Sequence, residues 1–205
     1  MSQSIFDKNL LIKLGPDRFQ KIACAKIGIA GAGGLGSNCA VALVRAGFRN
    51  FVIADFDEVD VTNLDRQAYF EDQVGMKKVE ALKINLLRIS KNLRMDVFDV
   101  KLDSSNISRI FSGCDVMVEC LDCPQMKSLF VSELLPLGKL LVTASGIGGV
   151  GANDEIRVHR IKENLVIVGD LKSDVEKSPA LAPRICIAAA KQADVVMEHI
   201  MNGRV

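Results

Sequence analysis

The sequence Lys26-Ile27-Gly28-Ile29-Ala30-Gly31-Ala32-Gly33-Gly34-Leu35-Gly36 decides the fold. Its first five residues form a short apolar run typical of a buried strand, and Gly31, Gly33 and Gly36 follow directly. Apolar residues at helical spacing continue to about residue 46, where Gly47 ends the helix. A glycine turn between a strand and a helix is the pattern of a nucleotide-binding βα unit. The stretch therefore predicts a Rossmann-like α/β fold.

The segments that follow alternate between apolar strands and amphipathic helices. We expect strands at residues 51–55, 95–100, 115–120 and 139–144, and helices at 76–91, 106–111 and 124–135. Parallel strands need crossover connections, so this alternation predicts a mostly parallel sheet with helices on both faces.

The end of the chain breaks that rhythm. A glycine-rich segment at 146–151 precedes two expected strands, 155–161 and 164–168, which we predict to pair antiparallel. A long polar loop at 170–183 leads to a final helix at 184–201, and loops of this length are often functional. We expect one domain over 1–205: an N-terminal helical segment (1–25), a nucleotide-binding core (26–150), and the strand pair, crossover loop and last helix (151–205).

Composition narrows the function classes. Lys plus Arg number 26 and Asp plus Glu 25, so no basic excess points to nucleic acid or to a membrane surface. Tyr69 is the only tyrosine and tryptophan is absent, which gives base stacking little support. The six cysteines mostly lie in apolar segments, and no signal peptide or membrane span is evident. We expect reduced, buried thiols and a cytoplasmic protein.

The glycine turn and the acid beyond it predict a nucleotide site. Gly31 permits the tight turn, Gly33 lets backbone approach a phosphate, and Gly36 lets the helix pack on the strand. Asp55 ends the second strand, 19 residues after Gly36, where a carboxylate can accept hydrogen bonds from ribose hydroxyls. These residues do not decide between NAD and ATP.

The segment Asp55-Phe56-Asp57-Glu58-Val59-Asp60-Val61-Thr62-Asn63-Leu64-Asp65-Arg66-Gln67 resembles a signature of the ThiF/MoeB/HesA family, which is related to the ubiquitin-activating enzymes. Gly75-Met76-Lys77-Lys78 and Cys120-Leu121-Asp122 match further motifs in order. Taken singly, each charged residue also fits a solvated face, and Arg66 could simply pair with Asp57 or Glu58. The joint occurrence favours ATP over NAD.

The resemblance implies a role for each matching position. Arg66, Lys78 and Asp122 would be catalytic: Arg66 with Asn63 would bind the β- and γ-phosphates, Lys78 would neutralise charge near the α-phosphate, and Asp122 would help to hold Mg²⁺. Lys127 is a weaker candidate for the acidic ligand. The whole implied nucleotide-binding set is Gly31, Gly33, Gly34, Gly36, Asp55, Asp57, Thr62, Asn63, Arg66, Gln67, Lys78, Asp122 and Cys123.

The implied reaction is adenylylation of a partner's terminal carboxylate by ATP, with release of pyrophosphate. The compact chain is most similar to the ThiF-type branch, whose substrate would be a ubiquitin-fold sulfur carrier ending in Gly-Gly, of the ThiS kind used for thiamine. A MoaD-like carrier for molybdopterin is the nearest alternative, and a homodimer is implied. An NAD-dependent oxidoreductase and a noncatalytic nucleotide-binding subunit are rival readings. An oxidoreductase would leave the cluster of polar motif residues unexplained. A noncatalytic subunit is disfavoured because the chain retains these motif residues.

Three departures from the family pattern matter. Cys120 and Cys123 form the only Cys-x-x-Cys pair, whereas a structural zinc needs four ligands, so we expect no zinc. The loop at 170–183 has no cysteine to accept an acyl group, and we expect Cys186, in the apolar helix after it, to be a core residue. The family's N-terminal arginine segment is missing, with Lys8 near its place. We expect the loop to contact the carrier's tail, and His159 and His199 to be non-catalytic.

Overall fold

The computed structural model describes residues 4–175 and 177–203. In chain order the helices and strands are α1 (Ile5–Leu14), α2 (Pro16–Cys24), β1 (Lys26–Ala30), α3 (Gly34–Ala46), β2 (Asn50–Asp55), η1 (Val61–Asn63), η2 (Glu71–Gln73), α4 (Lys78–Ile89), β3 (Arg94–Asp99), α5 (Ile107–Phe111), β4 (Val116–Glu119), α6 (Pro124–Leu134), η3 (Leu135–Leu137), β5 (Leu140–Ala144), η4 (Asn153–Glu155), β6 (Arg157–Lys162), β7 (Leu165–Gly169) and α7 (Ala182–Asn202), where η marks a 3₁₀ helix.

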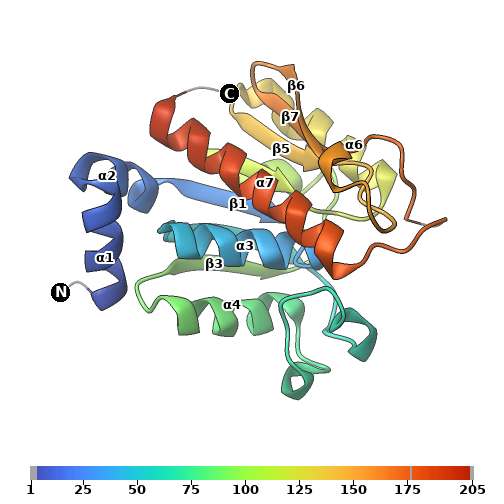
Figure 1. The fold of residues 1–205 in the computed structure, drawn as a ribbon, viewed down its shortest axis with the longest axis horizontal. Coiled ribbons are helices and arrows are strands. Elements are labelled where there is room, and N and C mark those ends of the chain that lie inside the picture. The colour runs from blue at the N-terminus through green and yellow to red at the C-terminus, as the bar shows by residue number, and fades with distance from the viewer. Residues whose placement is uncertain (1–3, 176, 204–205) are drawn as a thin grey trace.

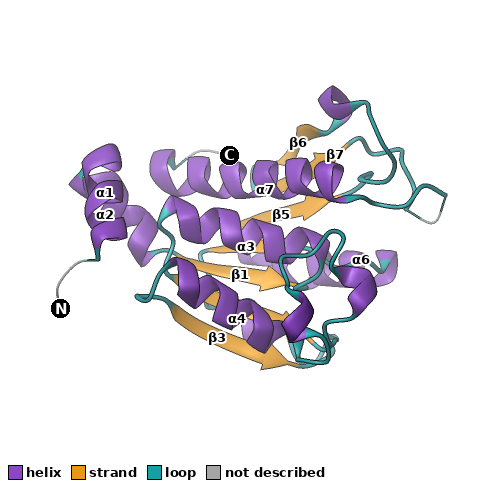
Figure 2. Cartoon of the chain, turned by 60° about the horizontal axis from the view of Figure 1, so that its bottom comes forward, coloured by secondary structure: helices purple, strands orange, loops and turns teal. Residues whose placement is uncertain are grey.

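The strands form one seven-stranded sheet in the order β3-β2-β1-β4-β5-β7-β6 (Figures 1 and 2). All neighbours pair parallel except β6 and β7, which pair antiparallel as expected. The sequence also predicted the order of strands and helices along the chain, with boundaries that shift by a few residues at most. The Rossmann-like prediction is confirmed.

Helices cover both faces of the sheet. Helices α3, α4 and α7 lie together over one face (Figure 2), and their apolar sides join the sheet in the larger buried cluster, which includes Leu43, Leu82 and Val196. On the other face α5 and α6 form a second cluster, in which the rings of Phe111 and Phe130 meet edge to face at 5.1 Å. The strands between these layers are buried on both sides, which explains their continuous apolar runs.

The N-terminal helices α1 and α2 lie beyond the amino ends of the parallel strands (Figure 2). Asp7, almost fully buried on α1, lies 2.6 Å from the Arg49 guanidinium and accepts a hydrogen bond from Asn92 at 2.8 Å. These contacts fix α1 to the loops that precede β2 and β3. Lys8 is exposed on the same helix, at the end of the sheet away from the carboxyl ends of the strands.

The register of β1 with its neighbours aligns the segments that form the site. Ala30 lies opposite Ala54 of β2 and Glu119 of β4. The residues that follow these three, Gly31, Asp55 and Cys120, therefore meet at one edge of the sheet. This edge is also the point where the strand order reverses, between β1 and β4, and such switch points open a crevice in α/β sheets.

Candidate nucleotide and acyl-transfer site

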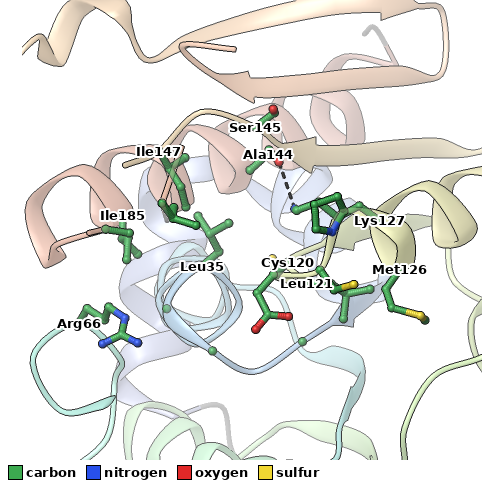
Figure 3. Close-up of a pocket in the computed structure, with 18 of the residues that line it drawn as sticks. Leu35, Arg66, Cys120, Leu121, Met126, Lys127, Ala144, Ser145, Ile147 and Ile185 are labelled. Atoms are coloured by element: carbon green, nitrogen blue, oxygen red, sulfur yellow. Dashed lines mark hydrogen bonds between the residues drawn. The ribbon is translucent and has the colours of Figure 1, made fainter. Parts of the chain in front are cut away.

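A cleft of about 1250 Å³ opens at the carboxyl ends of the parallel strands. Its walls come from the segments after β1, β2, β3, β4 and β5 and from the crossover loop between β7 and α7. Figure 3 shows Arg66 and Ile185 on one side of this cleft and Leu121 and Met126 on the other. Of the residues implied by the resemblance, the cleft brings together Gly31, Gly33, Gly34, Asp55, Asp57, Arg66, Gln67, Lys78, Asp122 and Cys123.

The glycine turn is packed too tightly for side chains at two positions. Gly31 has φ +92°, and a Cβ there would lie 2.7 Å from the carbonyl oxygen of Cys120. A Cβ at Gly36 would overlap the carbonyl oxygen of Gly31, so this glycine lets α3 pack against β1 and lies outside the cleft lining. Gly33 caps α3 without a side-chain hydrogen bond, which leaves the first N–H groups of the helix available to an anion.

Asp55 organises the backbone around it. One carboxylate oxygen accepts the N–H of Ala32 at 2.6 Å and the other accepts the N–H of Asp57 at 2.8 Å. Burial raises the pKa of Asp55 above its usual value, although these two N–H groups and the charge of Lys78 act in the opposite direction. Each oxygen retains a further lone pair, so the carboxylate can also accept hydroxyl hydrogens from a ligand in the cleft.

Lys78 carries the most buried ammonium group in the cleft wall. Its side chain is 7% exposed, and its Nζ atom donates to Asp57 Oδ2 at 2.7 Å. The residue begins α4, where Gly75 and a short bridge between Glu58 and Lys77 turn the chain back toward β2. The cleft therefore has a cation fixed by a neighbouring carboxylate.

Arg66 lies at the cleft with a different partner from those that the sequence suggested. Its Nη1 donates to Asp65 Oδ1 at 2.7 Å and to the carbonyl oxygen of Thr62 at 2.8 Å, so pairing with Asp57 or Glu58 is wrong. Next to it, Gln67 has a buried Oε1 atom with no hydrogen-bond partner among the described residues. An acceptor of this kind, in a cleft wall, is available to a ligand that donates a hydrogen bond.

Thr62 and Asn63 are not part of the cleft lining. Both side chains hydrogen-bond to Asp60, the N-cap residue of η1: Thr62 donates to its Oδ1 atom at 2.6 Å, and Asn63 Oδ1 accepts its N–H at 3.1 Å. The structure therefore gives no support to the implied direct roles of Thr62 and Asn63 in nucleotide binding. Short polar side chains near the start of a helical turn commonly hydrogen-bond to local backbone instead of a ligand.

An ion pair at the floor of the cleft joins Glu119, the last residue of β4, to Lys127 on α6. Glu119 is fully buried and accepts hydrogen bonds from the Leu121 N–H, the Thr143 hydroxyl and the Lys127 ammonium group. Lys127 also donates to the Ala144 carbonyl oxygen at 3.1 Å, the dashed contact in Figure 3. Lys127 thus has three protein acceptors, as many as it has N–H groups, which argues against its binding an acidic ligand.

Asp122 follows this floor and is exposed at the cleft, with no hydrogen bond or ion pair to any described residue. Within residues 4–175 and 177–203, no group of three or more His, Cys, Asp or Glu side chains could hold a metal ion by itself. Mg²⁺ commonly binds through one or two carboxylates plus substrate phosphates and water. A single free carboxylate beside a phosphate-binding turn fits that pattern.

The cysteines divide into two groups. Cys39, Cys114 and Cys120 are buried as expected, and burial raises the pKa of the Cys120 thiol well above its usual value, which disfavours the thiolate that zinc requires. Cys123 is partly exposed in the cleft at the start of α6. The expected core role of Cys186 is wrong: it is exposed on α7, and so is Cys24 on α2. Apolar neighbours in a helix do not tell which of its faces meets the core.

The cleft lining also includes residues that the sequence did not single out. Phe56, Val100, Leu102, Leu121 and Met126 form an apolar section beyond Asp55, and Lys101 and Lys172 add positive charge. Val100 and its neighbours follow β3, so the rule that parallel strands end at one edge could have found them. Neither His159 nor His199 lines the cleft.

A family model described as "ThiF family" matches residues 6–164, most of the chain. The chain belongs to the ThiF family. Relatives in this family include proteins named "Adenylyltransferase and sulfurtransferase UBA4". The one from Candida glabrata is 38% identical over 128 residues, and the one from Saccharomyces cerevisiae S288c is 33% identical over 132 residues. These alignments cover 62% and 64% of this chain but 30% of each relative, so the chain spans about a third of their length.

Solved structures share the ThiF-family fold. Escherichia coli tRNA N6-threonylcarbamoyladenosine dehydratase, TcdA, in complex with AMP superposes with a TM-score of 0.86 at 22% identity, covering 96% of this chain and 94% of that one. E. coli MccB with ATP gives a TM-score of 0.73 at 22% identity, covering 90% and 57%. These likenesses support the fold. No helix among the described residues is long and apolar enough to cross a membrane.

Proposed function

We propose that this ThiF-family chain is an ATP-dependent adenylyltransferase that activates the C-terminal carboxylate of a small carrier protein. One observation carries the proposal: three groups face a single cleft. They are the N-terminus of α3, which has no side-chain cap, the carboxylate of Asp55 and the ammonium group of Lys78. Phosphate, ribose and negative charge each find a complementary group there. The names of the relatives and the nucleotides bound to the structural neighbours agree with this choice.

The proposed nucleotide pose follows the walls of the cleft. Asp55 holds the ribose, the apolar section from Val100 to Met126 holds the base, and the N–H groups after Gly33 hold phosphate. Lys78 neutralises the α-phosphate. Arg66 lies at the opposite side from the apolar section, where the β- and γ-phosphates would extend (Figure 3). Asn63 supports Arg66 indirectly by stabilising η1, because its side chain hydrogen-bonds to the backbone of Asp60.

The proposed reaction needs positioning and charge neutralisation. An oxygen of the carrier's terminal carboxylate forms a bond to the α-phosphorus, and the bond from that phosphorus to the bridging oxygen breaks, which releases pyrophosphate and leaves an acyl-adenylate. A carboxylate is already ionised at neutral pH, so no general base is required. Asp122 would hold Mg²⁺, which when bound offsets phosphate charge. Arg66 and Lys78 reduce the repulsion between two anionic reactants.

We propose a ubiquitin-fold sulfur carrier ending in Gly-Gly as the partner, of the ThiS kind that serves thiamine synthesis. A MoaD-like carrier for molybdopterin is the alternative. A Gly-Gly tail is narrow and extended, and it suits the wall formed by residues 145–147 and 171–175, which line the same cleft as the glycine turn. With no cysteine in the crossover loop, the carrier acyl-adenylate would stay bound noncovalently to the enzyme until a separate sulfur donor attacks its acyl carbon and releases AMP.

We further propose a cytoplasmic homodimer in which each chain is one domain. A single sheet runs through the described residues, which supports one domain. Lys8 lies on α1, beyond the amino ends of the strands and so at the opposite end of the sheet from the cleft (Figure 2), a position that suits a role in a second copy of the chain. The Cys120–Cys123 pair is proposed to bind no zinc.

An NAD-dependent oxidoreductase is the second candidate, because the glycine turn and Asp55 also suit a dinucleotide. A calorimetric titration of the protein with ATP–Mg²⁺ and with NAD separates the two, and preference for NAD would refute the proposal. Incubation with ATP–Mg²⁺ and a panel of purified ThiS-like and MoaD-like carriers, followed by intact-mass spectrometry, tests the activity itself. An AMP adduct on one carrier supports the proposal. If the protein binds ATP but gives neither an AMP adduct nor carrier-dependent pyrophosphate exchange, that result would indicate a noncatalytic subunit.

A further inference from the structure

Arg184, in the first turn of α7, is buried in a place where a cation is unfavourable. It is the third residue of the helix, near the positive end of the helix dipole, and it is 4% exposed. Its Nε atom is buried without a hydrogen-bond partner among the described residues. Burying a charged pair is a weak source of stability compared with apolar packing. We therefore look to the segments that the guanidinium binds for the role of this residue.

The guanidinium binds two segments that are distant in sequence. Its Nη2 donates to Asp170 Oδ2 at 2.6 Å, in the turn after β7. Its Nη1 donates to the carbonyl oxygen of Gly151 at 2.5 Å and lies 3.4 Å from that of Ala152, at the end of the glycine-rich segment. Arg184 thus joins the crossover loop to the glycine-rich segment.

Asp170 passes this constraint to the lining of the cleft. Its second oxygen accepts the N–H groups of Lys172 and Ser173 at 2.8 and 2.7 Å. The turn between them places Leu171 at φ +62°, a backbone conformation that costs energy for a residue other than glycine. Leu171, Lys172 and Ser173 all line the cleft, and Leu171 is 47% exposed there.

The two segments also contact each other directly, through backbone N–H groups of the glycine-rich segment. Gly148 donates its N–H to Ser173 Oγ at 3.0 Å, and Gly149 donates its N–H to the Pro179 carbonyl oxygen at 3.1 Å. A Cβ at Gly148 would lie 2.6 Å from the carbonyl oxygen of Ser178, so the contact requires glycine. The crossover loop is therefore docked on the glycine-rich segment, and together they form one wall of the cleft.

We propose that Arg184 is a positioning residue for the acyl substrate, which acts through Asp170 to fix the turn at 171–173. The proposal rests on the function proposed above, because it assigns this wall to the carrier's tail and the glycine turn to the nucleotide. Neither Arg184 nor Asp170 lines the cleft itself, and Ile185, whose side chain lies where a Cβ on Gly34 would meet it, belongs to the larger buried cluster. Loss of the guanidinium should disturb the tail side of the cleft and leave the nucleotide side intact.

The test compares Arg184→Met with Arg160→Met. Arg160 on β6 pairs at 2.7 Å with Glu198 on α7, the helix that carries Arg184. That pair is exposed and lies outside the cleft lining, so Arg160→Met is a matched control. Native-state trypsin digestion, followed by mass spectrometry of peptides ending at Lys172, reports the position of the turn without any carrier. We expect Arg184→Met to be cut about tenfold faster than wild type, with the Kd for ATP–Mg²⁺ within about twofold, and Arg160→Met to match wild type in both.

With the carrier that wild type adenylylates, Arg184→Met should raise KM for that carrier about tenfold and change kcat little, because positioning is lost before chemistry. Arg184→Lys keeps the charge but cannot reach both segments. Its KM and its cleavage rate should therefore lie between those of wild type and Arg184→Met. Gly148→Ala separates the two segments without removing the ion pair and should reproduce the trypsin result, which covers the case in which Arg184→Met fails to fold.

Cleavage at the wild-type rate in both Arg184→Met and Gly148→Ala would overturn the inference, as would an unchanged KM or a parallel loss of ATP affinity. If wild type adenylylates no carrier, the proposed function fails. The role assigned to Arg184 in carrier binding then fails with it, whereas the digestion and ATP titration still show whether Arg184 fixes the turn.

Discussion

The ammonium group of Lys78 lies 2.7 Å from the carboxylate of Asp57, and both side chains face the nucleotide cleft. Because Lys78 is almost buried, Asp57 compensates its charge in the absence of phosphate and fixes its orientation. A cation that is already oriented loses little freedom when an anion arrives, which is the condition for efficient electrostatic stabilisation.

Lys78→Ala should therefore lower carrier-dependent ATP–pyrophosphate exchange by about a hundredfold, the scale of losing one preorganised charge contact. Lys83→Ala on the same helix is the control, because Lys83 does not line the cleft. Exchange measured for both variants at saturating ATP gives the comparison. Equal rates for Lys78→Ala and wild type would remove Lys78 from the proposed mechanism.

Arg66→Ala and Asp122→Ala should each lower the same exchange by at least about a hundredfold, for loss of a phosphate contact and of a proposed Mg²⁺ ligand respectively. Asp122→Ala should also raise the Mg²⁺ concentration that gives half-maximal rate, whereas Arg66→Ala should not. Arg45→Ala, an exposed arginine on α3, serves as control. Wild-type exchange in both cleft variants would refute the assignment of the site.

The glycine turn offers a matched pair of variants. Gly36→Ala places a methyl group on the Gly31 carbonyl oxygen, and we expect the free energy of unfolding to fall by at least about 1–3 kcal/mol in urea titrations. A Cβ at Gly33 would meet only Gln67 Nε2, at 3.8 Å, so Gly33→Ala should change stability by less than about 0.5 kcal/mol. The same Gly33→Ala protein should bind ATP–Mg²⁺ more weakly, because the methyl group faces the cleft. A stable Gly36→Ala protein would contradict the packing described here.

The anchor of α1 should be sensitive to acid. Although burial acts to raise it, hydrogen bonds from Asn92 and Ser4 and the charge of Arg49 leave the pKa of Asp7 below its usual value. A carboxyl whose pKa is lowered by folding stabilises the protein above its unfolded pKa, and that stabilisation is lost as the pH falls through the folded value. Asp7→Asn should lower the free energy of unfolding by about 1–3 kcal/mol at pH 7.

The difference between wild type and Asp7→Asn should persist down to about pH 4 and narrow below it. Urea titrations of both proteins between pH 7 and 3 measure this. A gap that widens as the pH falls would show that the anchor does not depend on ionised Asp7.

The sequence predicted the fold better than the partners of its charged residues. Strand and helix periodicity, together with the glycine turn, was enough for a mostly parallel sheet ending in an antiparallel pair, because these patterns are local. It also accounts for Asp55 and Asp122 lying at one cleft, since parallel strands end at one edge, whereas Lys78, at the start of α4, was suggested by the resemblance alone.

The wrong predictions concern side chains whose hydrogen-bond partner or burial depends on their immediate neighbours. Arg66 pairs with Asp65 and Thr62 instead of Asp57 or Glu58, and Asn63 caps its own 3₁₀ turn, because short-range partners cost the least chain entropy. Cys186 is exposed because an apolar run does not define which side of a helix is buried. The ion pair of Glu119 with Lys127 could not be foreseen, because it depends on how α6 packs against the end of β4.

The backbone contact between the glycine-rich segment and the crossover loop limits how this family member could change its partner. A side chain at Gly146 would collide with Asp170, and one at Gly148 with Ser178, so these two positions are restricted to glycine. Leu171, Val175 and Leu181 protrude from the other side with large exposed fractions. Under the proposed function, a change of carrier could therefore proceed through exposed side chains such as these three, on a backbone that the two glycines keep the same.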